Sequence, residues 1–189
     1  MWTWDSAYGQ MEAEANMFAS FLLMPLDDFR AQTIAFKRPT VLDFDALRNR
    51  YAVSLTAAIL KWLEITPVRA MIVVSRDGFI DWSWTSKPLF RDSIFFRAKQ
   101  TTTPLPDASL ASRQDTSPVA VQGVLHPPGV WWEGEEVFES VIYSEYHGMA
   151  VSLLIFPNEP AYTPPWLREA DEEPMLVDIA EKFASTSRR

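Results

Sequence analysis

The first part of the chain carries apolar residues at helical spacing. Between Tyr8 and Met24 a stripe of apolar residues recurs every three or four positions, as one buried helix face requires. The members of that stripe are Met11, Ala15, Phe18, Ala19 and Leu22. Pro25 ends the segment, because proline lacks a backbone N–H and disfavours helical geometry in the residue before it. The acidic pair at 27–28 then predicts the start of a second, short helix.

Two more helices are predicted close together. Residues 43–51 form the first, with Asp43 as its expected N-cap, and residues 55–65 form the second, capped by Ser54. Their short connection gives them the shape of a helix-turn-helix pair. The second helix is mostly apolar, whereas helices that read a DNA groove need several polar or basic side chains. We therefore expect this pair to pack within the protein and to bind no nucleic acid.

From Pro67 onward the pattern becomes typical of strands. Runs at 68–75 and 79–84 flank Arg76-Asp77-Gly78, whose Asp-Gly pair predicts a hairpin. Further strands are predicted at residues 93–99, 119–125, 136–143 and 149–156, with a loop at 101–118 and a short amphipathic helix near 175–184.

These elements predict an α+β fold with three parts. Residues 1–38 and 39–66 form the helical region and the helix-turn-helix-like pair, and residues 67–189 form a β-rich domain with an antiparallel sheet and an acidic tail. Alternating tryptophans at 82 and 84, and the pair at 131 and 132, are interpreted as sheet core and stacking. The acidic run at 133–136 is interpreted as a solvated turn.

Composition narrows the functional classes. The net charge of −8, concentrated as an acidic excess in the C-terminal half, disfavours binding to a phosphate backbone. Cysteine is absent, which excludes a disulfide framework and a cysteine-based zinc site. No apolar run approaches the roughly 20 residues that span a bilayer, so we expect a cytoplasmic protein with no membrane partner.

The most informative segment runs from Glu12 to Pro25 and reads E-A-E-A-N-M-F-A-S-F-L-L-M-P. It resembles the ImmA/IrrE-type zinc metallopeptidases, in which this string follows a helix with the motif H-E-x-x-H. The segment around residues 50–58 resembles the helical pair that follows in the same family. The resemblance implies a zincin-like domain and zinc-dependent cleavage of a regulatory protein, typically a helix-turn-helix repressor.

The resemblance also assigns two residues to the metal site. A catalytic zinc takes three protein ligands, two of which H-E-x-x-H would supply. The family pattern places the third at Glu12, with Asn16 one helical turn away to orient its carboxylate. Glu14 lies on another side of the helix and is the weaker candidate.

This chain departs from the family at the metal site. It contains no H-E-x-x-H, and its two histidines, His126 and His147, are far downstream and are interpreted as surface or turn residues. We therefore expect the chain to bind no zinc and to be inactive as a peptidase. Either it is the C-terminal part of an active peptidase, or it is a non-catalytic module that binds a protein or ligand. If the chain is the C-terminal part of a longer peptidase, the stripe of Met11, Phe18 and Leu22 is expected to be only partly covered, whereas full burial would indicate a complete, reorganised domain.

Overall fold

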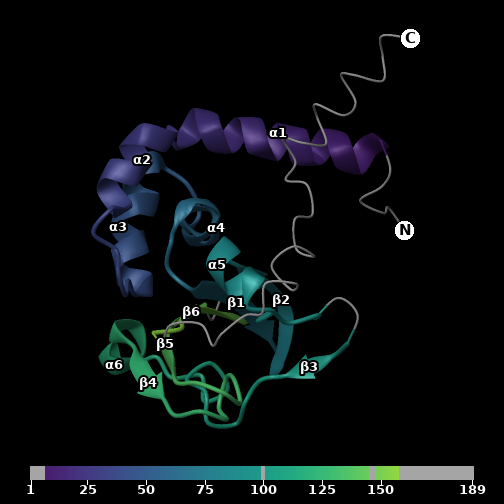
Figure 1. Ribbon diagram of the computed structural model, residues 1–189, viewed down its shortest axis with the longest axis vertical. Helices are drawn as coiled ribbons and strands as arrows, with labels where there is room; N and C mark the ends of the chain where they lie inside the picture. The colour runs from purple at the N-terminus through teal and green to yellow at the C-terminus, as the bar shows by residue number, and fades with distance from the viewer. Residues whose placement is uncertain (1–6, 99–100, 145–147, 158–189) are drawn as a thin grey trace. The chain divides into compact units, whose positions relative to one another are not determined.

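Four helices lead into one antiparallel sheet in the computed structural model, which describes residues 7–98, 101–144 and 148–157. The α+β fold class is confirmed. The first four helices lie within a few residues of the predicted positions (Figure 1): α1 Ala7–Leu23, α2 Leu26–Thr33, α3 Val41–Tyr51 and α4 Leu55–Ile65.

Local caps fix where the helix pair begins. Ser54 caps α4 as predicted, because its Oγ accepts a hydrogen bond from the backbone N–H of Ala57 at 3.1 Å. The predicted cap of α3 is wrong: the N-cap is Thr40, and the helix begins at Val41. Asp43 is the third helical residue, and its carboxylate accepts from the Thr40 backbone N–H at 2.7 Å. It therefore completes a capping box.

The sheet has six strands among the described residues, ordered β3-β2-β1-β6-β5-β4 with every neighbouring pair antiparallel. Their bounds are β1 Ala70–Arg76, β2 Phe79–Thr85, β3 Thr103–Pro104, β4 Val124–His126, β5 Val137–Ser144 and β6 Met149–Ile155. The predicted hairpin is confirmed between β1 and β2. Asp77 and Gly78 both have positive φ, 52° and 81°, as tight turns between twisted strands favour.

Two of the predicted strands are wrong. Of the predicted strand at 93–99, the described residues 93–98 follow the short helix α5, Lys87–Arg91, and form no strand, although Ile94 is buried. Residues 119–125 divide between helix α6, Pro118–Gln122, and strand β4. Ser117 caps α6 and Pro118 occupies its first turn, and these signals outweigh the β-branched residues that suggested a strand.

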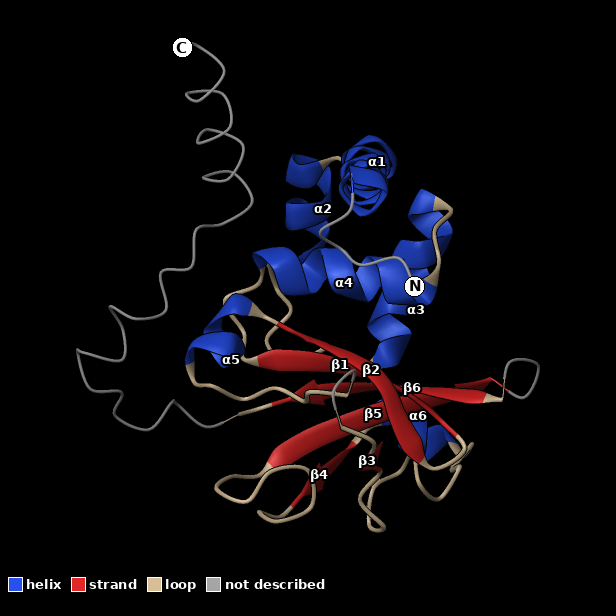
Figure 2. Cartoon of the chain, turned by 90° about the vertical axis from the view of Figure 1, so that its right-hand side faces the viewer, coloured by secondary structure: helices blue, strands red, loops and turns tan. Residues whose placement is uncertain are grey.

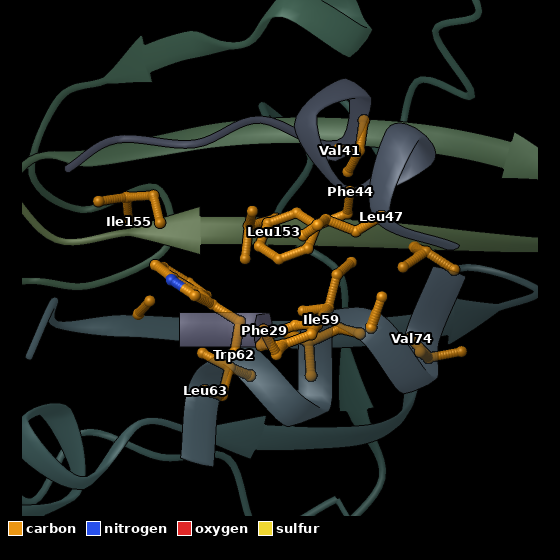
Figure 3. Packing of buried hydrophobic residues seen from close by; sticks show 14 of the residues in the cluster. Phe29, Val41, Phe44, Leu47, Ile59, Trp62, Leu63, Val74, Leu153 and Ile155 are labelled. Carbon is orange, nitrogen blue, oxygen red and sulfur yellow. The ribbon is translucent and has the colours of Figure 1, made fainter. Parts of the chain in front are cut away.

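One face of the sheet is covered by helices α2, α3 and α4. Figure 3 shows Phe44, Ile59 and Trp62 from these helices beside Leu153 and Ile155 from β6. The helix layer is tied to the sheet by a polar contact as well, since the Val41 backbone N–H donates to Ser140 Oγ at 3.1 Å. In Figure 2, α4 lies between α1 and the sheet.

The opposite face is covered by the segments between the strands. A second core there contains residues of alternate register on the strands together with apolar residues of the connecting segments, among them Met71, Val73, Leu89, Ile94, Leu110, Trp131, Val141 and Leu154. None of the described helices is long and apolar enough to cross a membrane. The predicted helix near 175–184 lies outside the described residues.

Candidate functional site

Glu12 and Asn16 both lie on α1, one helical turn apart. The backbone of the helix is described at these positions, but neither side chain is among those the structure describes. Their assignment as the third zinc ligand and its orienting partner therefore remains a prediction.

The side chains that are described provide no zinc site. Within residues 7–98, 101–144 and 148–157, no group of three or more His, Cys, Asp or Glu could hold a metal ion. His126 contacts a buried glutamate, and His147 lies outside the described residues. Because the described donors do not fit a catalytic zinc, no reaction step through zinc can be derived from them.

The apolar stripe of α1 is exposed to solvent, as predicted. Met11, Phe18 and Leu22 have relative exposures of 63%, 70% and 68%. Ala15, on the same stripe, is exposed too. A monomer seldom leaves such a row of large apolar side chains in water, so this face of the helix is a candidate interaction surface.

The opposite side of α1 rests on α4. The ring of Phe21 lies 3.9 Å from Lys61 Nζ, and Met24 is buried in the helical core. The Lys61 side chain is 1% exposed, and its Nζ lies 3.4 Å from the half-exposed carboxylate of Glu64. The Phe21 ring and the Glu64 carboxylate thus both lie beside the buried Nζ of Lys61.

Helix α4 is an internal packing element. Its residues Ala58, Ile59, Trp62 and Leu63 are buried in the core shared with the sheet. Its one basic side chain, Lys61, is buried and so cannot reach a phosphate from this position. These contacts support the interpretation that the helix pair packs within the protein.

A buried carboxylate organises the face of the sheet opposite to the helices. Glu139 on β5 is 0% exposed, and its two oxygens accept four hydrogen bonds. The donors are the backbone N–H groups of Leu110 and Ala111 at 3.0 and 3.2 Å, Trp131 Nε1 at 2.8 Å and Ser152 Oγ at 3.2 Å. The four donors around this one carboxylate anchor two connecting segments to the sheet.

The interpretation of His126 as a surface or turn residue is wrong. It ends β4, is buried, and places Nε2 2.9 Å from Glu139 Oε2. The sequence did carry one signal of this centre. Glu139 stands between Val137 and Val141 at strand spacing, so it must share their face, and both valines are buried in the second core.

Two of the four tryptophans singled out in the sequence, Trp131 and Trp82, pack in the interior. Trp131 is buried, packs near Phe96 with ring centroids 6.2 Å apart, and donates to Glu139. Trp82 packs against the helical core, whereas Trp84, on the same strand, is 59% exposed.

The interpretation of residues 133–136 as a solvated turn is wrong for Glu135. Its two oxygens accept from Arg69 Nη1 and Nη2, both at 2.8 Å, and Arg69 Nε donates to Asp92 at 2.6 Å. Burial lowers the pKa of Arg69, but the hydrogen bonds that Arg69 donates to Glu135 and Asp92 outweigh that effect and leave the pKa raised. These contacts of Arg69 with Glu135 and Asp92 join the start of β1 to two segments that are distant in the sequence.

Comparison with known proteins identifies the helical region. Residues 5–63 match the peptidase family described as the IrrE N-terminal-like domain. The match covers α1, α2, α3 and most of α4, and it includes Glu12 and Asn16. Among curated proteins, none matches this chain. The helical N-terminal third of the chain is therefore similar to the ImmA/IrrE-type metallopeptidase family.

Proposed function

We propose that this chain is a non-catalytic member of the ImmA/IrrE family that recognises a regulatory protein, such as a helix-turn-helix repressor, without hydrolysing it. One observation carries the proposal: residues 5–63 match the family, yet the sequence contains no H-E-x-x-H. That motif provides two zinc ligands and the general base in such peptidases. Glu12 alone cannot replace them, because a catalytic zinc needs about three protein ligands.

The surroundings of His126 support the same conclusion. His126 faces the buried carboxylate of Glu139 from β4, on the sheet face opposite to the helices, whereas Glu12 lies on α1. A zinc site that joined Glu12 to His126 would have to cross the sheet. Recognition of a protein remains compatible with the fold, since it requires a surface and no metal.

The experiment measures zinc, cleavage and binding on the same preparation. The purified 189-residue protein is loaded with zinc, dialysed and assayed for bound metal, for cleavage of candidate repressors and for binding to them by calorimetry. We expect no stoichiometric zinc, no chelator-sensitive cleavage, and binding to one repressor. Tight zinc binding that is lost when His126 or His147 is replaced would contradict the proposal.

A second candidate function has its own support. The family match includes Glu12 and Asn16 one turn apart on α1, which is the arrangement expected of a third zinc ligand and its partner. If an H-E-x-x-H helix is joined to this chain in a longer gene product, that product would be a zinc-dependent endopeptidase acting on regulatory proteins. In such a protein Glu12→Gln should abolish activity. In the 189-residue chain the same change should alter the free energy of unfolding by less than about 0.5 kcal/mol.

A further inference from the structure

The exposed face of α1 has the spacing of a coiled-coil seam. Met11, Ala15, Phe18 and Leu22 are separated by four, three and four residues, which is the alternation of core positions in a heptad pattern. All four are exposed, and three of them are large. The seam runs for about 17 Å along a helix of about 25 Å, long enough for one helix to pack along it.

The apolar area on α1 is close to that of a specific interface. The three large residues of the seam, Met11, Phe18 and Leu22, are exposed by 63–70%. Together they present roughly 400 Å² of surface, whereas a standard interface buries about 800 Å² per partner, somewhat over half of it apolar. Pairing along the seam would therefore cover an area close to the apolar share of a specific interface.

The seam is complementary to itself in one orientation. Two antiparallel copies of α1, related by a twofold axis between residues 16 and 17, set Phe18 opposite Ala15 of the second copy and Met11 opposite Leu22. Each large ring then faces a small side chain, which allows close packing. A parallel pairing would set Phe18 against Phe18 and Ala15 against Ala15, and so leave a bulge beside a gap.

The flanking positions place no like charges together in this orientation. Antiparallel pairing brings the acidic positions 12 and 14 toward positions 19 and 21 of the second copy, which are Ala19 and Phe21. The helix is also accessible, because α4 separates α1 from the sheet and α1 forms the outer edge of the helical layer (Figure 2). We propose that α1 pairs with α1 of a second copy of this chain to form an antiparallel, twofold-symmetric dimer.

The first test measures the oligomeric state by sedimentation equilibrium of the 189-residue protein at micromolar concentrations. We expect a concentration-dependent dimer, and Phe18→Glu should raise its Kd at least about 100-fold, because two charges would be buried at the centre of the seam. Ile34→Glu is the matched control: Ile34 is apolar and 87% exposed but lies at the end of α2, so the dimer should persist. Far-UV circular dichroism checks that each variant is folded.

The second test fixes the orientation. Ala15→Lys and Phe18→Glu should each be monomeric alone, and an equimolar mixture should form a heterodimer in which Lys at 15 faces Glu at 18. A parallel pairing gives no such contact and predicts no recovery. A folded wild type that is monomeric at about 100 µM, a Phe18→Glu variant that still dimerises, or a mixture that stays monomeric would each overturn the proposal. These outcomes are independent of zinc, cleavage and repressor binding.

Discussion

The carboxylate of Glu139 lies 2.9 Å from His126 Nε2, in a centre where Glu139 is 0% exposed. Among the described residues His126 is the one basic side chain within ion-pair distance of Glu139. The remaining neighbours of the carboxylate are neutral donors from the backbone and from Trp131 and Ser152. This centre holds the connecting segments against the sheet, so removing the Glu139 carboxylate should lower the free energy of unfolding.

Glu139→Gln should lower the free energy of unfolding by about 3 kcal/mol. The amide keeps the shape of the side chain, but its NH₂ group faces donors and it loses the charge that strengthens four hydrogen bonds. Urea denaturation measures the effect, with Glu133→Gln as the control, because Glu133 is exposed and should change stability by less than about 0.5 kcal/mol. A loss below about 1 kcal/mol for Glu139→Gln would contradict the assigned role.

Arg69→Met should lower the free energy of unfolding by about 2–4 kcal/mol, because Glu135 and Asp92 would be left with side chains only 13% exposed and without their cation. The stability of Arg69→Lys should lie between that of the wild type and that of Arg69→Met, since lysine keeps the charge but not the planar fork that binds Glu135 through two nitrogens. Arg76→Met, at the exposed end of β1, is the control. Equal stability of Arg69→Lys and the wild type would show that the fork geometry is unimportant.

The contact between α2 and α3 should make stability depend on pH in the acidic range. Tyr51 Oη donates to Asp28 at 2.6 Å and Arg50 Nη2 lies 3.1 Å from it, and these groups, Tyr51 first, hold the pKa of Asp28 below its usual value. A carboxyl group with a lowered pKa in the folded state stabilises the protein above its unfolded pKa of about 3.9, and that contribution is lost as pH falls through the folded value.

The measurement compares urea denaturation of wild type and Asp28→Asn at pH 5 and pH 3. The variant should lose less stability over this interval than the wild type. Asp27→Asn is the matched control. The Asp27 side chain is fully exposed and its contact with Arg30 is long, at 3.9 Å, so this variant should keep the wild-type slope of stability against pH. If Asp28→Asn also keeps that slope, the contact contributes nothing to the pH dependence.

The chain should not bind duplex DNA at physiological salt. The net charge is −8, and the only basic residue of α4 is buried beneath α1. Specific DNA binding typically has a Kd of about 10⁻⁸ M or lower, so a gel shift at micromolar protein is a sensitive assay. A known DNA-binding protein on the same gel provides the positive control. A sequence-specific shift that weakens with salt would overturn the packing interpretation of α3 and α4.

Much of the fold could be predicted from local patterns. Apolar spacing located α1, Ser54 located the start of α4, and the pair Asp77-Gly78 located the hairpin, because each depends on residues within a few positions of one another. Local signals also explain the errors. The β-branched residues at 119 and 121 predicted a strand, whereas Ser117 and Pro118 start a helix there.

By itself the sequence determined the family resemblance of residues 5–63 and the helical order, because the ordered string from Glu12 to Pro25 and the apolar periods are local features. Only the tertiary structure decided which charged residues are buried and which partners they bind. Glu135 and Arg69 are 66 positions apart, and Glu139 is buried by donors from three other segments. From the sequence alone a carboxylate is expected to be solvated, because its hydrogen-bond donors are not known. Those donors are brought next to it only by the strand register and the packing of the connecting segments.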